Sequence, residues 1–311
     1  MSFFERFEAK LGRLMLAALL AAILLPAGVV AERSYRAAHD MFAPAVASPL
    51  LRHPRATGVQ GLTDVSFSSA DGHTIGAWYV RSRNRAAVIV THGTNDDRSS
   101  MLAELRLLAG AGFGVLAFDW PGLGASSGAI RWDSGAQSAL AAAAGWLDAR
   151  SDVDADKIGA LGFSMGGVML VRFASADQRV RAVVLEGTPS SFEDYVAYHY
   201  TRWGPLSEWP ARLALSNSDL LDEALAPDRV IGKVAPRPVF LIGGDRDTEV
   251  PAVLVRKLYS AAGEPKSLWI VPGAQHGRYL QAARSEYASR VTDFFDAALL
   301  RSGVPPSRPL R

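Results

Sequence analysis

The 311-residue sequence contains no cysteine. Disulfide bonds, thiol nucleophiles and cysteine-ligated metal sites are therefore all excluded, although this absence does not identify a cellular compartment. The basic residues are scattered without a run of five or six, and the formal net charge is only +2, so nothing points to nucleic acid. The six histidines are dispersed and lack the spacing of metal ligands, so we expect no metal site.

The glycine-rich stretch GLGASSG at 122–128 also lacks what a nucleotide site needs. It has neither the lysine of a phosphate-binding loop nor the spacing of a dinucleotide fingerprint. We therefore expect no cofactor.

The N-terminus carries an apolar run, Leu14 to Val30, without a charged or hydrogen-bonding side chain. We favour an uncleaved membrane anchor in residues 1–31, over a signal peptide cut after Ala31 or a buried core helix. Three basic residues precede the run and two follow it, which places the N-terminus inside and the remaining chain outside the cytoplasm. A secreted or periplasmic protein is the alternative.

From residue 62 onward, short apolar segments alternate with helical patterns. The predicted strands are a hairpin at 63–80 and segments 86–90, 113–120, 157–163, 180–187, 238–244 and 267–273, and the predicted helices are 101–112, 134–150, 165–175, 251–262 and 280–300. This order predicts the α/β class, with a mostly parallel, twisted sheet covered by helices on both faces. We expect a linker at 32–61, one domain at 62–300 and a flexible tail at 301–311.

The segment 188–236 interrupts this alternation and is predicted to be a small helical, lid-like insertion over the sheet. Ser190 and Glu193 are predicted to form a capping box that begins one of its helices. The aromatic residues of the segment either line an apolar substrate pocket or fill a core beneath the insertion. The candidates for substrate binding are Tyr195, Tyr198, Trp203 and Trp209.

Ser164 stands between two glycines in GFSMG, residues 162–166, where a predicted strand meets a helix. A sharp strand-to-helix turn leaves no room for side chains two residues to either side, which accounts for Gly162 and Gly166. Such a turn exposes the Ser164 hydroxyl and directs the backbone N–H of Met165 toward a developing negative charge. Close packing at the glycines, without chemistry, is the alternative for this motif taken alone.

A serine hydroxyl needs a base to take its proton, and the base needs a group that orients it. His276 follows the last predicted strand, at the edge of the sheet where open α/β sheets bind ligands. Asp245 and Asp247 follow the preceding strand, and we choose Asp247 as the orienting carboxylate, with a surface turn as its alternative role.

Five stretches, in this order along the chain, together resemble the α/β-hydrolase family. They are THGTN (91–95), FDWPGLGASSG (118–128), GFSMGG (162–167), GGDRDTEVP (243–251) and PGAQHGRY (272–279). The resemblance covers about residues 62–300 and is strongest to lightly capped, ABHD-like or serine aminopeptidase-like hydrolases with an N-terminal membrane segment. It implies the α/β-hydrolase fold and the chain order Ser, Asp, His, and it selects Asp247 over Asp245.

The resemblance also implies roles for these residues. Ser164 would attack a carbonyl carbon, His276 would carry the proton to the leaving group, and Asp247 would orient His276. The backbone N–H groups of Met165 and Thr94 would form the oxyanion hole.

The leading hypothesis is a serine hydrolase that cleaves carboxylic esters, including lipid acyl esters, through an acyl-enzyme. A serine peptidase of the aminopeptidase-like type would use the same residues, and it would need a carboxylate such as Glu193 or Glu208 to hold a substrate amine. A non-catalytic binding protein with the same fold is the third alternative. We expect a small-molecule or lipid ester and the membrane, through residues 14–30, as partners.

Overall fold

A computed structural model describes residues 3–40, 54–216 and 218–301. The chain consists of two compact units. Unit 1 combines Met1–Met41 with Val196–Asn217, and unit 2 combines Phe42–Tyr195 with Ser218–Arg311. The two units are described separately.

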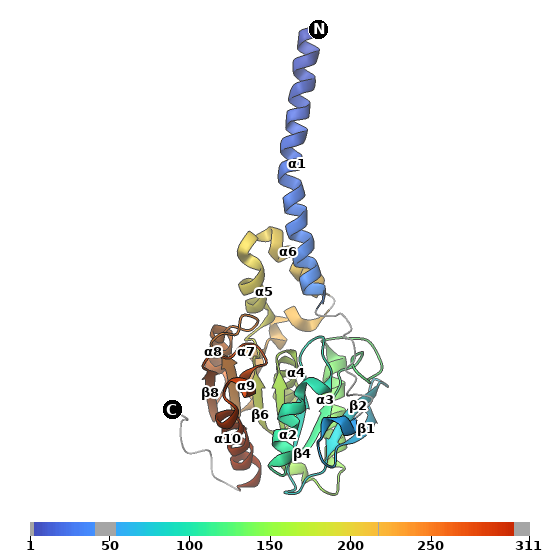
Figure 1. The fold of residues 1–311 in the computed structure, drawn as a ribbon, viewed down its shortest axis with the longest axis vertical. Helices are drawn as coiled ribbons and strands as arrows, with labels where there is room; N and C mark the ends of the chain where they lie inside the picture. Colours follow the sequence, from blue (N-terminus) through green and yellow to red (C-terminus); the bar gives the residue numbers. More distant parts are fainter. Residues whose placement is uncertain (1–2, 41–53, 217, 302–311) are drawn as a thin grey trace. The chain divides into compact units, whose positions relative to one another are not determined.

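Unit 2 is built on an eight-stranded sheet with the order β1-β2-β4-β3-β5-β6-β7-β8 (Figure 1). Only β1 with β2 and β2 with β4 pair antiparallel within this sheet, and all its other neighbours are parallel. The strands are β1 (Thr63–Ser68), β2 (Thr74–Val80), β3 (Ala87–Thr91), β4 (Gly114–Phe118), β5 (Ile158–Phe163), β6 (Val180–Glu186), β7 (Val239–Gly244) and β8 (Lys266–Val271). The predicted hairpin and the mostly parallel sheet are confirmed.

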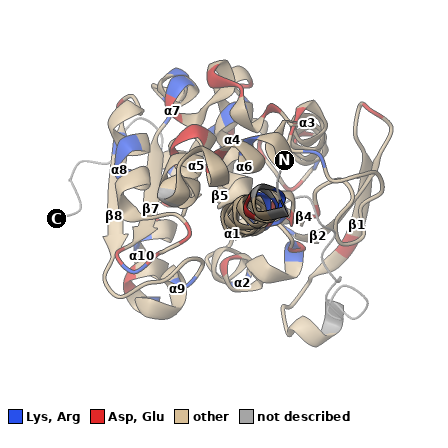
Figure 2. Ribbon diagram, turned by 90° about the horizontal axis from the view of Figure 1, so that it is seen from above, with Lys and Arg blue, Asp and Glu red and all other residues tan. Residues whose placement is uncertain are grey.

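Helices cover both faces of this sheet (Figure 2). On one face α2 (Leu102–Gly110) and α10 (Arg284–Phe295) bury leucine and aromatic side chains in a common core. On the other face lie α3 (Ser134–Asp148), α4 (Met165–Ala176), α7 (Pro227–Val230) and α8 (Ala252–Ala261). The alanine-rich face of α3 is buried, because small side chains let a helix approach its neighbours closely. Shorter elements are η3 (Pro54–Thr57), η4 (Arg98–Met101), η5 (Ala155–Lys157), η7 (Asp219–Leu221), η8 (Glu223–Leu225), η9 (Ile231–Val234), α9 (Tyr279–Ala282) and η10 (Asp296–Leu300).

Unit 1 contains the long helix α1 (Phe3–His39), which packs against α6 (Pro205–Leu215). By length and composition α1 is able to cross a membrane, and its most apolar window is not buried. The helix runs past the expected boundary at residue 31, and an ion pair between Glu32 and Arg36, spaced at i,i+4, supports the added turns. Of the linker expected at 32–61, residues 41–53 lie outside the described residues, as do residues 302–311 of the expected tail.

The predicted insertion at 188–236 is helical, but it is divided between the units. Its helices are α5 (Phe192–Tyr200), η6 (Thr201–Trp203) and α6, followed by η7, η8, α7 and η9. The predicted capping residue is wrong by one position. Asp194 donates its backbone N–H to Ser191 Oγ at 3.0 Å, whereas Ser190 Oγ donates to the Asp194 carboxylate at 2.5 Å. Helix α5 begins at the buried Phe192, so the residue directly before it caps the first turn.

Candidate active site

Ser164 forms the turn between β5 and α4 and has a strained backbone, with φ +52° and ψ −119°. A non-glycine residue in such a conformation costs about 1–3 kcal/mol and persists only where the surrounding structure enforces it. A Cβ on Gly162 would lie 2.7 Å from the Gly167 Cα, and one on Gly166 would lie 2.5 Å from the His92 carbonyl oxygen. The structure confirms the expected reason for both glycines, which is close backbone approach around the serine.

His276 and Asp247 are joined by a hydrogen bond, with 2.8 Å between Nδ1 and Oδ2. The other carboxylate oxygen, Oδ1, accepts the backbone N–H groups of Glu249 and Val250 at 2.9 and 2.8 Å. Asp245 instead accepts the N–H of Gly273 at 2.6 Å and so ties the loops after β7 and β8 together. Of the two aspartates considered from the sequence, Asp247 is the one that contacts the imidazole.

Tyr279, on α9, is a further member of this group that the sequence did not single out. Its hydroxyl donates to Asp247 Oδ2 at 2.6 Å and lies 3.5 Å from His276 Nδ1. Burial raises the pKa of Tyr279, and the neighbouring Asp247 charge raises it further, so the phenol keeps its proton. Burial alone would raise the pKa of Asp247, but hydrogen bonds from His276 and Tyr279 and the His276 charge bring it below its ordinary value. Asp247 is therefore ionised at neutral pH.

Contacts made by the residues next to Ser164 place it at the same edge of the sheet as His276. The Phe163 ring lies 4.8 Å from the His276 ring, centroid to centroid. The Ser164 N–H donates to the Glu186 carbonyl at 2.7 Å, and a Cβ on the following Gly187 would lie 2.9 Å from His276 Cε1. Within the described residues Ser164 Oγ makes no hydrogen bond to His276, and such contacts often tighten only when substrate binds.

The loop after β3 lies against this serine turn and carries Thr94. A Cβ on Gly93 would lie 3.3 Å from the Ser164 Cβ. Met165 is the first residue of α4, with its side chain buried, so its N–H stands at the helix N-terminus beside Ser164. The backbone segments predicted to form an oxyanion hole are thus adjacent.

His92 holds that loop in place as a neutral side chain. Its Nδ1 lies 2.9 Å from the Gly93 carbonyl oxygen, and its Nε2 faces the Trp120 N–H at 3.3 Å. The Trp120 indole N–H in turn donates to the His92 carbonyl at 2.9 Å. Complete burial lowers the pKa of His92 to about 4, which fits a histidine that donates from one nitrogen and accepts at the other.

Asp119, in the loop after β4, organises the surrounding backbone. Its carboxylate accepts the N–H of Arg98 and the N–H of Ala125, each at 2.7 Å, and pairs with the Arg98 guanidinium. Both side chains of this pair are buried. Arg98 also pairs with the half-exposed Asp64 at 3.1 Å.

We expect Asp119→Asn to lower the free energy of unfolding by roughly 3–5 kcal/mol, because it removes one partner of a buried ion pair. Asp64→Asn is the matched control and should cost less than about 1 kcal/mol, since that carboxylate is half exposed. Urea denaturation of the full chain in detergent micelles measures both values. Equal losses for the two variants would contradict the organising role of Asp119.

A buried pair of carboxyl groups lies beneath the serine turn. Glu186 ends β6, Glu104 belongs to α2, and the Tyr287 hydroxyl of α10 donates to Glu186. Burial raises the pKa of Glu104 to about 7. Burial raises the pKa of Glu186 as well, and the Glu104 charge raises it further.

This pair predicts a stability that declines as the pH rises from about 4.5 to about 7. Glu104 sets this range, because it keeps its proton up to about pH 7 in the folded chain and loses it near pH 4.5 in the unfolded chain. The free energy of unfolding therefore falls as the pH rises. Glu104→Gln should reduce the decline by on the order of 2 kcal/mol, while Glu286→Gln on the exposed side of α10 serves as the surface control. Urea midpoints between pH 5 and 8 give the slopes. His92 has the opposite effect, because its lowered pKa makes the fold less stable as the pH falls. This contribution is the same in wild type and Glu104→Gln, so it drops out when the two slopes are subtracted.

The aromatic residues proposed for substrate binding are divided between the two units. Tyr195 belongs to unit 2, whereas Tyr198, Trp203 and Trp209 belong to unit 1 and have more than half of their side-chain surface exposed. Core filling beneath the insertion is therefore wrong for these three.

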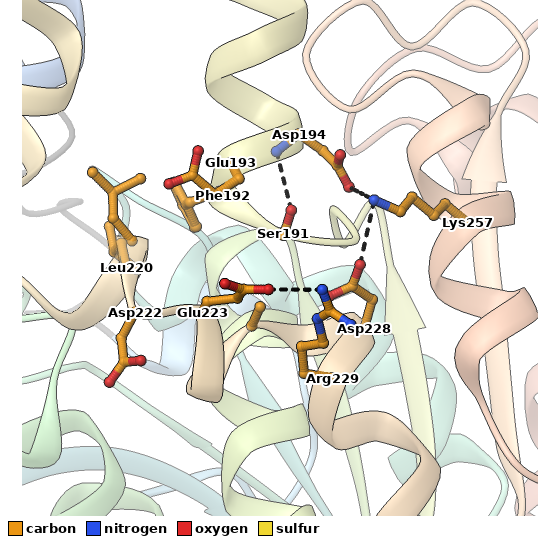
Figure 3. A pocket seen from close by; sticks show the side chains of 12 residues that line it. Ser191, Phe192, Glu193, Asp194, Leu220, Asp222, Glu223, Asp228, Arg229 and Lys257 are labelled. Atoms are coloured by element: carbon orange, nitrogen blue, oxygen red, sulfur yellow. Dashed lines mark hydrogen bonds and ion pairs between the residues drawn. The ribbon is translucent and has the colours of Figure 1, made fainter. Parts of the chain in front are cut away.

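A charged cavity occupies the part of the insertion that belongs to unit 2 (Figure 3). Glu193, at the start of α5, is among the residues that line it. Lys257 bridges Asp194 and Asp228 at 2.6 and 3.4 Å, and Arg229 pairs with Glu223 at 2.7 Å. Glu208, the other carboxylate considered for binding a substrate amine, pairs instead with Arg212 at 2.9 Å.

Comparison with known proteins agrees with this architecture. Residues 86–203 match a family described as "alpha/beta hydrolase fold". The uncharacterized protein Rv2307c of Mycobacterium tuberculosis is 36% identical over 217 residues, covering 68% of this chain and 72% of that protein. The uncharacterized protein YfhR of Escherichia coli K12 is 27% identical over 244 residues, covering 76% and 81%.

Among solved structures, the esterase Pf2001 of Pyrococcus furiosus has a TM-score of 0.69 and 25% identity, covering 82% of this chain and 97% of that chain. The chain belongs to the α/β-hydrolase superfamily.

Proposed function

We propose that this protein is a serine hydrolase that cleaves carboxylic esters through an acyl-enzyme. The observation that carries the proposal is the strained Ser164 at the β5–α4 turn, on the sheet edge where His276 is hydrogen-bonded to Asp247. A serine becomes a nucleophile beside a base that a buried carboxylate orients, and the pairing of His276 with Asp247 supports this role for Ser164.

In the first half of the reaction Ser164 Oγ attacks the ester carbonyl carbon while His276 takes the hydroxyl proton. The backbone N–H groups of Met165 and Thr94 donate to the developing oxyanion. When the bond to the leaving alcohol breaks, His276 gives it the proton, and the acyl group remains on Ser164. Water then attacks the acyl-enzyme with His276 as base, and the acid is released.

The substrate class is tested by comparing p-nitrophenyl esters, from acetyl to palmitoyl, with aminoacyl anilides. We expect hydrolysis of the esters and little release of anilide. Faster turnover of the anilides would instead support the peptidase alternative. That alternative needs a carboxylate to hold the substrate amine, and Glu193 is one of the residues that line the charged cavity in Figure 3.

We further propose that α1 anchors the chain in a membrane and that unit 2 lies outside the cytoplasm. The apolar run and the excess of basic residues before it support this topology. N-terminal sequencing of the protein from the membrane fraction tests whether the N-terminal segment is retained as an anchor. A chain that begins after Ala31, recovered in the soluble fraction, would show a cleaved signal peptide instead.

A further inference from the structure

Helix α6 exposes large apolar side chains on one of its faces. Leu206, Trp209 and Leu213, spaced at i, i+3 and i+7, are 50%, 73% and 64% exposed, and Trp203 in the preceding turn is 58% exposed. A helix of a soluble domain normally turns such a stripe toward the core. A cluster of this kind on a surface marks a site of interaction with another apolar surface.

The small residues of α6 face the opposite way. Ser207, Ala211 and Ala214 are buried, and α6 packs along α1. Small side chains let two helices approach closely. Leu215, the last residue of α6, is also buried, whereas Leu206, Trp209 and Leu213 are left on the outside of the helix pair.

The position of α6 along α1 indicates what covers this face. Among the α1 side chains that the structure describes, Ser34 and Ala38 are the most buried, and they lie just beyond the apolar run that ends at Val30. Figure 1 shows α6 beside this C-terminal part of α1. The apolar run of α1 is roughly 25 Å long at 1.5 Å per residue, close to the thickness of a bilayer core. Glu32, Arg33 and Arg36 follow it and stand where a spanning helix would leave the hydrocarbon.

We propose that Trp203, Leu206, Trp209 and Leu213 form a lipid-binding face that inserts into the interfacial layer of the bilayer beside the end of α1. This inference rests on the membrane anchoring proposed above for α1. Tryptophan favours the membrane–water interface, because its ring is apolar and its N–H is polar. The apolar surface of α6 would continue that of the neighbouring α1, which favours lipid over a water-soluble occupant as its partner.

The chain contains no cysteine, so a single introduced cysteine can be labelled at a chosen position without other thiols reacting. Leu206→Cys and Leu213→Cys are each labelled with an environment-sensitive NBD fluorophore in the full chain, reconstituted in phosphatidylcholine vesicles. Val253→Cys on α8 is the matched control, because Val253 is also an exposed aliphatic residue, 60% accessible, but belongs to unit 2. Leu19→Cys reports separately on the α1 span.

We expect labels at 206 and 213 to be quenched by lipids carrying a bromine or doxyl group, and several-fold less by aqueous iodide than the label at 253. Iodide quenching at 206 and 213 equal to that at 253 would overturn the proposal. Protection from both quenchers that grows with the protein-to-lipid ratio would also overturn it, in favour of contact between two copies. If the label at 19 is not quenched by the lipid probes, the proposed span itself fails. Retained ester hydrolysis shows that each labelled variant is folded.

Discussion

Replacing Ser164 by alanine is expected to lower kcat for a p-nitrophenyl ester by about a million-fold, as loss of a triad nucleophile does. The variant removes the atom that forms the acyl-enzyme and leaves only binding and oxyanion stabilisation. Alanine keeps the Cβ of serine and lacks only the hydroxyl, so the substitution adds no new clash at this strained turn, and the fold should be preserved. Steady-state hydrolysis and thermal unfolding of the same preparation separate a chemical defect from a folding defect.

Ser175→Ala is the matched control for this experiment. Ser175 lies on α4, the helix that follows Ser164, and its hydroxyl donates to the Arg172 carbonyl within that helix. We expect hydrolysis close to that of wild type. Comparable turnover by Ser164→Ala and Ser175→Ala would contradict the assignment of the nucleophile.

Asp247→Asn is expected to lower kcat by about ten thousand-fold, because an amide in place of the carboxylate favours the wrong imidazole tautomer. Oδ2 of the carboxylate accepts from both His276 Nδ1 and the Tyr279 hydroxyl. An amide NH₂ group at that position is a hydrogen-bond donor and cannot accept from either. The pKa of Asp247 lies below its ordinary value, so this charge is present throughout the neutral range.

Asp245→Asn provides the comparison, since Asp245 lies two residues away on the same loop. Its hydrogen bond goes to the Gly273 backbone N–H, and an asparagine carbonyl can still accept it. We expect less than about a tenfold change in kcat, in line with the modest net value of one hydrogen bond. A severe loss in Asp245→Asn with near-normal hydrolysis by Asp247→Asn would reverse the assignment.

The sheet was predictable because its central strands are short, apolar on both faces and separated by helical patterns. The segments around Ser164, Asp247 and His276 were recognisable because each carries a local turn signature directly after a strand. Such signatures indicate the backbone conformation over a few residues, so they do not show which distant segments come into contact.

Contacts between distant segments were not predictable in this way. Tyr279 reads in the sequence as an ordinary aromatic residue at the start of a helix, and only the fold brings its hydroxyl to Asp247. Glu104 and Glu186 are 82 positions apart, and no spacing rule indicates that two carboxyl groups share one buried site. Likewise, aromatic content alone does not tell whether Trp209 turns inward or outward, since both are compatible with a helical period.

The central claim is that Ser164 is the nucleophile of an acyl-transfer reaction. Treatment of the full chain with a fluorophosphonate, followed by peptide mass spectrometry, tests it directly, because this reagent forms a stable adduct with an activated serine. We predict a single adduct on Ser164, its absence in Ser164→Ala, and much slower labelling in Asp247→Asn. An unlabelled wild-type protein, or an adduct on another serine, would contradict the account.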